Sequence, residues 1–297
     1  MKKRMLAWLL VLVMALGMVP VPAMAQEYAP TDGTAIDRVY QTEGDTEPPG
    51  PIDGALTPFS LTPTEPAQAE GVYQISSKEE LAWLAQEVNE GRGGSYHAVL
   101  THDIDLENEP WTPIGDYYKK FQGSFDGQGH TVSGLNVSGA EYAGLFGYVQ
   151  GSSSEQAVIQ NVVVQGSVNG TSDAGGIAGR ADRASFANCG SEAAVQAAGS
   201  GNAGGIVGRQ HTYGAPITIT GCYNAGPVSG SRAGGIIGSI GGEADISSCY
   251  NTGEITGSNS GGIRGHLGSF IGNISGCYNA GAVTGSSSGP IQPSTTV

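Results

Sequence analysis

The sequence predicts an all-β chain folded as a right-handed parallel β-helix, a solenoid with an amphipathic capping helix at its N-terminal end. Three observations predict this fold. Glycine accounts for 49 of the 297 residues, whereas only 13% of the residues are charged. A glycine-bounded tetrapeptide recurs at intervals of 27 to 32 residues. Between its copies, apolar residues return at fixed offsets, as in repeats that stack on one another.

The tetrapeptide consists of glycine, a hydrophobic residue, any residue and glycine. It occurs at residues 144–147, 176–179, 205–208, 235–238 and 262–265. Such a short unit cannot bury a core alone, so it must stack on its neighbours. Stacking equivalent strands in one sense gives parallel sheets, whose crossovers strongly prefer the right hand. A Greek-key sandwich or a propeller is the alternative, although propeller blades need about 40 residues or more.

Four columns of equivalent residues lie between the tetrapeptides. We align one apolar column as Leu135, Val162, Cys189, Cys222, Cys249 and Cys277. Three residues earlier, a second apolar column contains Val132, Ile159, Phe186, Ile219, Ile246 and Ile274. Four residues after each member of the first column, a column of small residues contains Gly139, Gly166, Ala193, Gly226, Gly253 and Gly281. Six residues after the first column, the last five units have Val168, Val195, Val228, Ile255 and Val283.

The cysteines belong to an apolar column, because their equivalents in earlier units are Leu135 and Val162. We therefore interpret Cys189, Cys222, Cys249 and Cys277 as free thiols stacked in the core. Disulfides are the alternative, since four cysteines in an exported protein normally favour them. A metal site is disfavoured, because no histidine or second cysteine lies nearby in the same unit.

Two further columns follow the cysteines. Asparagine stands two residues after them, at Asn224, Asn251 and Asn279, and we interpret these side chains as a structural hydrogen-bonded ladder. The intervening residues Tyr223, Tyr250 and Tyr278 should face the other way, as an exposed stripe. Exposed tyrosines suit contact with glycan or protein. Packing on a neighbouring turn is the alternative.

One helix is predicted before the array. Ser77 and Glu80 have the spacing of a capping box, and Asn89 and Gly91 provide a stop signal. Between them, apolar residues recur with helical spacing at Leu81, Leu84, Ala85 and Val88. We expect this helix to cover the open first edge of the β array. Residues 99–106 then alternate apolar and polar, which predicts a half-buried strand.

The N-terminus has the features of a secretory signal peptide. Lys2, Lys3 and Arg4 precede an apolar run over residues 5–19, and residues 23–25 form an A-x-A cleavage site. A membrane anchor is the alternative, but that run is shorter than the roughly 20 residues of a membrane span. No later apolar stretch is long enough to span a membrane. We expect cleavage near Ala25 and a secreted or cell-surface location.

These features divide the chain into four parts. We predict a signal peptide (1–25), a disordered linker rich in proline, threonine and acidic residues (26–70), a capping helix with the first β-helix turns (71–143), and the repeat array (144–297). A further unit begins at Ser288 and stops at Val297 without a polar capping repeat. We therefore expect the chain to be part of a longer surface protein.

Charge disfavours some partners. The formal net charge is −14, and removal of the signal peptide would leave ten basic against 27 acidic residues, a charge of −17. Such a chain should not bind nucleic acid or anionic lipid through its overall field. The five histidines contain no H-x-x-x-H pair, so a zinc-peptidase helix is not indicated. We predict no cofactor.

Several motifs together resemble the GLUG repeat of bacterial surface proteins. They are G-L-F-G (144–147), the later G-G-I-x-G segments, and C-Y-N-x-G-x-[VI]-x-G between them. The preceding segment also resembles what comes before such repeats, with E-L-A-W-L (80–84), D-I-D-L (103–106), W-x-P-I-G (111–115) and F-D-G-x-G-H-T-[VI] (125–132). The resemblance covers about residues 72–291 and implies an exported β-helical stalk or adhesin-like module. Such repeats also occur in the non-catalytic region of bacterial IgA-cleaving metallopeptidases, so no catalytic residues carry over.

We therefore expect a non-enzymatic surface module that either contacts a host or matrix glycan or protein, or serves as a structural stalk. The alternative is a polysaccharide lyase or hydrolase, whose site needs clustered carboxylates. The only dense acidic set is Asp103, Asp105, Asp116 and Asp126, and a turn explains the last of these. Arg180, Arg209 and Arg264 could meet acidic ligands, but we do not place them in one column.

Overall fold

The computed structural model describes residues 61–92, 95–211, 215–267 and 271–289. The predicted signal peptide and residues 26–60 of the predicted linker lie outside the described residues. Residues 61–70, which we assigned to the linker, belong instead to the folded unit: Pro66 is buried, and the Thr64 N–H donates to the Glu79 carbonyl at 3.1 Å. Strand β1 (Ala67–Ala69) also forms a hairpin with β2 (Val72–Ile75). Glu70 and Gly71 make its turn at positive φ.

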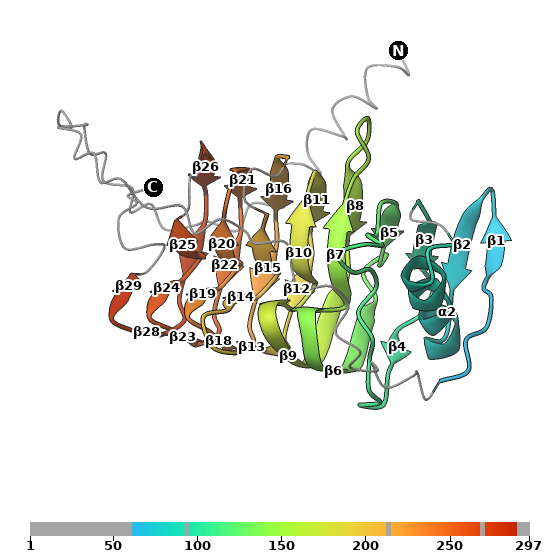
Figure 1. Ribbon diagram of the computed structural model, residues 1–297, viewed down its shortest axis with the longest axis horizontal. Helices are drawn as coiled ribbons and strands as arrows, with labels where there is room; N and C mark the ends of the chain where they lie inside the picture. Colours follow the sequence, from blue (N-terminus) through green and yellow to red (C-terminus); the bar gives the residue numbers. More distant parts are fainter. Residues whose placement is uncertain (1–60, 93–94, 212–214, 268–270, 290–297) are drawn as a thin grey trace, which may run out of the picture. The chain divides into compact units, whose positions relative to one another are not determined.

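Three sheets of stacked, parallel strands build the fold (Figure 1). Sheet A runs in the order β1, β2, β3 (His97–Leu100), β5 (Ser124–Asp126), β8 (Ala157–Gln160), β11 (Ala184–Ala187), β16 (Ile217–Thr220), β21 (Glu243–Ser247) and β26 (Ile271–Ser275). Sheet C contains β7 (Phe146–Gln150), β10 (Ala178–Asp182), β15 (Val207–Gln210), β20 (Ile237–Ile240) and β25 (Arg264–Leu267). Among the described residues, only β1 and β2 pair antiparallel.

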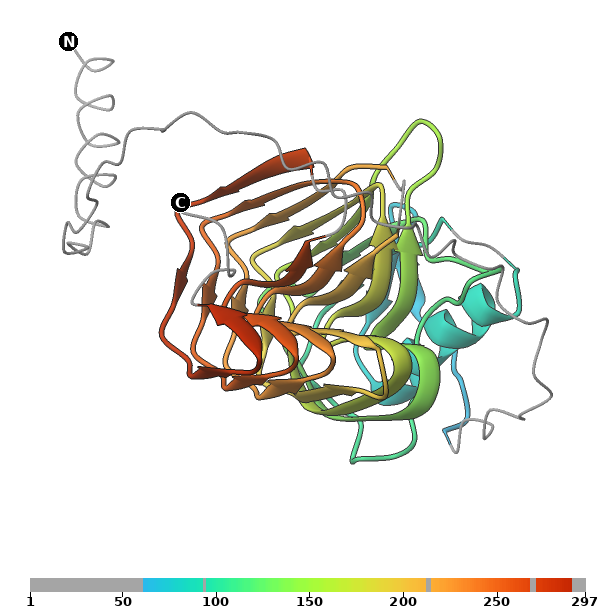
Figure 2. The same cartoon turned by 60° about the vertical axis from the view of Figure 1, so that its left-hand side comes forward.

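Sheet B contains the remaining strands and includes the tight bends of each turn. Its strands are β4 (Ile104–Asp105), β6 (Thr131–Ala143), β9 (Val163–Gly175), β12 (Gly190–Ser191), β13 (Ala194–Ala197), β14 (Asn202–Gly204), β17 (Tyr223–Asn224), β18 (Val228–Ser229), β19 (Arg232–Gly234), β22 (Tyr250–Asn251), β23 (Ile255–Thr256), β24 (Asn259–Gly261), β27 (Tyr278–Asn279), β28 (Val283–Thr284) and β29 (Ser287–Gly289). Figure 2 shows the turns stacked one behind another. The predicted parallel solenoid is confirmed.

The predicted helix is α2 (Lys78–Asn89), and it crosses over between the parallel strands β2 and β3. Ser77 caps it as expected, because its Oγ accepts a hydrogen bond from the Glu80 N–H. The Glu80 carboxylate bonds to the N–H of Ser76 at 2.6 Å. The apolar face of α2 is buried in the core. The edge of sheet A is β1, however, so the helix forms part of the first turn and does not cover that edge.

The half-buried strand expected over residues 99–106 is divided in two. Strand β3 ends at Leu100 in sheet A, and β4 begins at Ile104 in sheet B. Thr101 occupies the corner, where both its N–H and its hydroxyl donate to the Ile75 carbonyl. The alternation of apolar and polar residues is interrupted at His102, which is exposed, and resumes with Ile104 and Leu106, which are buried in the same core as Leu100.

Register between strands supports the apolar columns from the second unit onward. Phe186 pairs with Ile159 and Ile219, and the column continues to Ile246 and Ile274. The predicted alignment is wrong for the first unit. Ile159 pairs with Phe125 and not with Val132, and Val132 pairs with Val164.

Leu135 likewise pairs with Gly166, so it does not belong to the column of Val162 and the cysteines, and Gly139 leaves the glycine column. The misalignment has two causes within the first unit. The turn after Phe125 is longer, and β6 shifts register between Val132 and Leu135.

The first glycine of the tetrapeptide at Gly144, Gly176, Gly205 and Gly235 lies where a side chain would collide with neighbouring atoms, and so does the last glycine in all five copies. A β-carbon on Gly205 would overlap the Asn224 side chain and the Gly235 carbonyl. A β-carbon on Gly208 would lie 2.6 Å from the Ala174 nitrogen, across the narrow bend between sheets B and C. The hydrophobic residue between the two glycines is fully buried in all five copies, at Leu145, Ile177, Ile206, Ile236 and Ile263.

We predict that Gly205→Ala destabilises the protein by about 3 kcal/mol or more, because the Gly235 carbonyl and the Asn224 side chain must both move. Gly199 provides a matched control, since it has φ +56 but no atom within 4 Å of an added β-carbon. Gly199→Ala should cost only about 1–2 kcal/mol, through the left-handed backbone alone. Chemical denaturation of the two variants measures the difference. Equal losses would contradict the proposed close packing.

Candidate functional site

The asparagine column lies inside the solenoid and forms a continuous ladder. Asn224 Nδ2 donates to Asn251 Oδ1 at 2.7 Å, and Asn251 Nδ2 donates to Asn279 Oδ1 at the same distance. Each amide also donates to the carbonyl two residues later, at 2.8 Å. The amide nitrogens are therefore occupied by structural bonds, whereas Asn224 Oδ1, at the first rung, is buried without a hydrogen-bond partner among the described residues. In the preceding turn Ser191 takes the same position.

The four cysteines are free thiols in the core, and only Cys277 is partly exposed. Neighbouring turns are joined by weak hydrogen bonds, in which the N–H groups of Cys189 and Cys249 donate to the sulfurs of Cys222 and Cys277 at 3.4 Å. Hydrogen bonding to the neighbouring thiol of Cys222, together with burial, raises the pKa of Cys249 to about 12. The Cys249 thiol therefore stays protonated at neutral pH.

The tyrosine column faces outward and forms one continuous stack. The rings of Tyr223 and Tyr250 lie 5.4 Å apart at 11°, and those of Tyr250 and Tyr278 lie 5.3 Å apart at 7°. Tyr223 and Tyr250 are half-buried, and Tyr278 is 56% exposed. The first ring lies over Gly190, and its hydroxyl donates to Glu192 Oε1 at 3.2 Å. Residues 223, 250 and 278 together form an outward stack of nearly parallel rings, here called the tyrosine stripe.

A buried charged cluster lies at the narrow bend between sheets B and C. Arg180 contacts the Asp173 carboxylate through Nε at 2.9 Å and through its terminal nitrogen at 2.7 Å. Its guanidinium also stacks 4.5 Å from the centre of the Tyr142 ring. Burial alone would lower the pKa of Arg180, but Asp173 and the nearby tyrosines raise it overall. Arg180 is therefore a charged, fully engaged structural group.

A second buried acid lies beside this cluster. The Tyr148 hydroxyl donates to Asp182 Oδ2 at 2.5 Å, and both residues are almost fully buried. Burial raises the pKa of Asp182, although the Tyr148 hydrogen bond and nearby cations oppose this shift. This cluster was not among the sites predicted from the sequence. A signal was present, because Tyr148 and Arg180 each directly follow a tetrapeptide, where later units have Arg209, Ser239 and His266.

The three arginines do not share one column, as expected, although two of them, Arg180 and Arg209, pair in register on adjacent strands of sheet C. Arg264 lies in another column, which it shares with Ile237 and Val207. That side chain is fully buried, and burial lowers its pKa to about 10.

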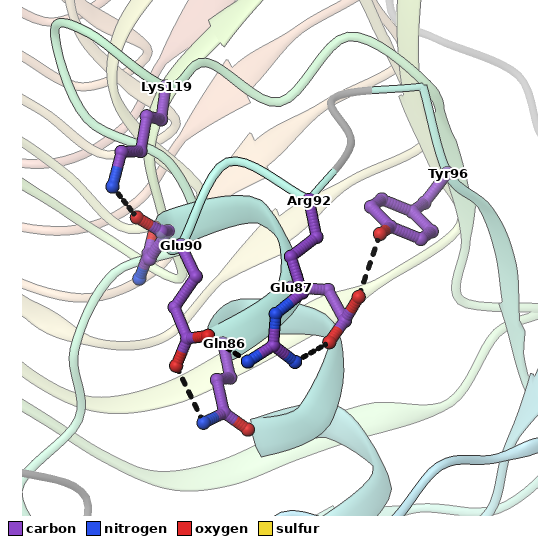
Figure 3. Close-up of polar contacts among 7 residues, drawn as sticks. Gln86, Glu87, Glu90, Arg92, Tyr96 and Lys119 are labelled. Atoms are coloured by element: carbon purple, nitrogen blue, oxygen red, sulfur yellow. Dashed lines mark hydrogen bonds and ion pairs between the residues drawn. The ribbon is translucent and has the colours of Figure 1, made fainter.

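Another polar cluster surrounds the C-terminal end of α2 (Figure 3). Arg92 contacts the carboxylates of Glu87 and Glu90, and the Tyr96 hydroxyl donates to Glu87 Oε2 at 3.1 Å. The Lys119 ammonium donates to the last carbonyl of the helix, at Asn89, at 2.6 Å. This cation stabilises the negative end of the helix dipole. The cluster fastens the helix to the first turns of the solenoid.

The four acids considered for catalysis all support local backbone structure. Asp105 and Asp126 accept hydrogen bonds from N–H groups two residues later, and Asp116 accepts from the two residues at positions 118 and 119. Asp103 accepts from the Thr131 N–H at 2.9 Å and contacts His130 at 3.1 Å. These contacts give each carboxylate a structural role.

Hollows and metal-binding groups are few within the described ranges. A groove of about 330 Å³ is lined by Pro110, Trp111, Thr112, Pro113, Asn136, Ser138 and Ala140, none of which titrates. The described residues contain no group of three or more histidine, cysteine or acidic side chains arranged to hold a metal. In the same part of the chain, no helix has the length and apolar character needed to cross a membrane.

Comparison with known proteins supports the resemblance seen in the sequence. Residues 229–256 match the family model of the GLUG motif, and they include the strands from β19 to β23. The chain carries a GLUG motif. The match lies within one turn of the solenoid, where the asparagine ladder and the tyrosine stripe are both present. The GLUG motif is thus one rung of a parallel β-solenoid.

The chain is also similar to longer proteins. It is 31% identical over 155 residues to Halomucin of Haloquadratum walsbyi, matching 51% of this chain and 2% of that protein. It is 31% identical over 108 residues to a provisionally named Gly-rich membrane protein of Evansella cellulosilytica, matching 34% of this chain and 12% of that one. The matches thus span only a small part of either relative.

One solved structure shares the fold. It is a provisionally named immunoglobulin A1 protease from Bacteroides ovatus, with a TM-score of 0.56 and 23% identity. The match covers 72% of this chain and 77% of that one. At this identity the likeness concerns the fold of the GLUG-containing solenoid.

We predict that the buried thiols make stability depend on alkaline pH. The pKa of Cys249 is about 12 in the folded protein, against 9.0 for an unperturbed cysteine thiol. The contribution of the protonated Cys249 thiol to the free energy of unfolding is therefore fully present below about pH 9. It is lost as the pH rises towards about 12, by up to about 1.4 kcal/mol per pH unit. Denaturation midpoints measured across this window should fall less steeply for Cys249→Ala. Identical slopes would argue against a protonated thiol ladder.

Proposed function

We propose that this chain is an exported, surface-located module without catalytic activity, which acts as a rigid spacer and presents a contact surface for glycan or protein. The proposed location is supported by the signal-peptide features of residues 1–25 and by a relative whose name describes a membrane protein. The proposed lack of catalysis is supported by the structural bonds of the acids and amides described above.

The tyrosine stripe is the single observation that carries the contact role. Cysteine and asparagine side chains in adjacent columns are engaged within the solenoid, whereas the tyrosine rings lie on its outside. Stacking across neighbouring rungs holds the rings nearly parallel, so little side-chain entropy is lost on contact. Tyrosine combines a broad apolar ring with a hydroxyl, which suits sugar or protein surfaces.

Replacing the stripe should abolish binding without unfolding the chain. We predict that a triple variant, Tyr223→Ser with Tyr250→Ser and Tyr278→Ser, loses at least about tenfold in affinity for its partner, about 1.4 kcal/mol. Glycan arrays and immobilised matrix proteins provide the partners to be screened. A matched control replaces outward hydroxyls on sheet A, Thr220→Ala with Ser247→Ala.

Four results are informative. Binding lost only in the tyrosine variant supports the contact role of the stripe. Binding unchanged in that variant would overturn the assignment of the contact surface to the stripe. Binding absent from the native protein leaves only the spacer role. Release of reducing or unsaturated sugar from polysaccharides by the purified protein would overturn the proposed lack of catalysis.

A further inference from the structure

The asparagine ladder has a direction along the solenoid. Each amide nitrogen donates one hydrogen to the next turn, as Asn224 does to Asn251 at 2.7 Å, and the other to a carbonyl in its own turn. Each amide oxygen therefore accepts its hydrogen from the turn before it. The turn before Asn224 has Ser191 at this position, and Asn224 Oδ1 is buried without a hydrogen-bond partner among the described residues.

Ser191 provides a second buried oxygen of the same kind. It pairs in register with Asn224 and is 0% exposed, and within the described part of the chain its Oγ has no hydrogen-bond partner. On the other side Ser191 pairs with Val164, whose side chain cannot form a hydrogen bond. Buried polar atoms in proteins are almost always hydrogen-bonded, because an unmade bond is costly. The two oxygens therefore need a partner between their turns.

The serine side chain is too short to bond to Asn224 as an asparagine would. A β-carbon on Gly205 would lie 2.4 Å from Asn224 Cγ, and a β-carbon on Gly176 would lie 2.2 Å from Ser191 Oγ. The two side chains thus leave their turns in the same direction, and the serine oxygen takes the place of an asparagine Cγ. The nitrogen that would donate to Asn224 Oδ1 lies one bond beyond that place.

A third polar group faces the same point. In the later turns each amide nitrogen also donates to the carbonyl two residues on, which belongs to Gly226, Gly253 or Gly281. The equivalent carbonyl in the turn of Ser191 is that of Ala193, because the register is the same before and after it. The Ala193 carbonyl and the two buried oxygens therefore surround the place that an amide nitrogen takes in the later turns.

We propose that Ser191, Ala193 and Asn224 bind one buried water molecule, which takes the place of an amide nitrogen and begins the ladder. Its two hydrogens bond to Asn224 Oδ1 and to the Ala193 carbonyl, and its oxygen accepts the Ser191 hydroxyl hydrogen. Buried waters typically make about three hydrogen bonds to polar groups that would otherwise be unsatisfied. A water also fits by size, because serine has fewer heavy atoms than the asparagine of the later turns. The inference goes beyond the proposed contact function and does not depend on it.

The direct test is a high-resolution crystal structure of the whole protein. We expect one water within about 2.5–3.0 Å of Ser191 Oγ, Asn224 Oδ1 and the Ala193 oxygen. In crystals of Ser191→Asn, the new amide nitrogen should take that place, and the water should be gone. A direct bond between Ser191 Oγ and Asn224 Oδ1 in the native protein, or no density at this place, would overturn the inference.

Thermal melting provides a second test. Ser191→Ala removes the hydroxyl that bonds to the water, so we expect the melting temperature to fall by about 2–4 °C. If no water were bound, this change would remove an unsatisfied buried hydroxyl and raise the melting temperature. Ser229→Ala, in β18 on the outside of the solenoid, is the matched control and should melt like the native protein. An unchanged or higher melting temperature for Ser191→Ala would contradict the inference, and the native crystal structure decides the question if that variant does not fold.

Discussion

The asparagine ladder and the glycines that make room for it are the constraint on which this structure depends. An amide in the core must satisfy its hydrogen bonds there, because an unsatisfied buried donor or acceptor costs about 1–3 kcal/mol. Asn251 does so by bonding to the asparagines above and below it and to its own turn. Gly235 lies against that side chain, where a β-carbon would collide. The ladder and the glycine-rich segment therefore require each other.

This mutual requirement explains why the fold extends by whole turns. Three successive turns each contribute an asparagine to the ladder, at Asn224, Asn251 and Asn279, and a thiol to the core, and each is bonded to its neighbouring turn. Most recurring side chains take part in these contacts between turns. The surfaces that remain for binding are the outward positions, where the tyrosines stack.

Much of this architecture could be predicted from the sequence, because parallel stacking repeats the same residue at the same place. The columns from Phe186 to Ile274 are visible without a structure for that reason. The first unit was misaligned because its longer turn after Phe125 and the irregular register of β6 displace equivalent residues by several positions. The Arg180–Asp173 pair was missed because it joins two columns across a bend, and no periodicity along the chain connects them.

The most direct test of this account removes one whole turn. Deleting the 27 residues 224–250 joins Tyr223 directly to Asn251. Tyr223 then takes the place of its register partner Tyr250, so every column stays in register. A control deletion of residues 224–249 shifts the register by one residue and turns each strand over. We expect cooperative denaturation, with a slightly smaller m-value, only for the first deletion. Equal loss of folding in both proteins would contradict the account.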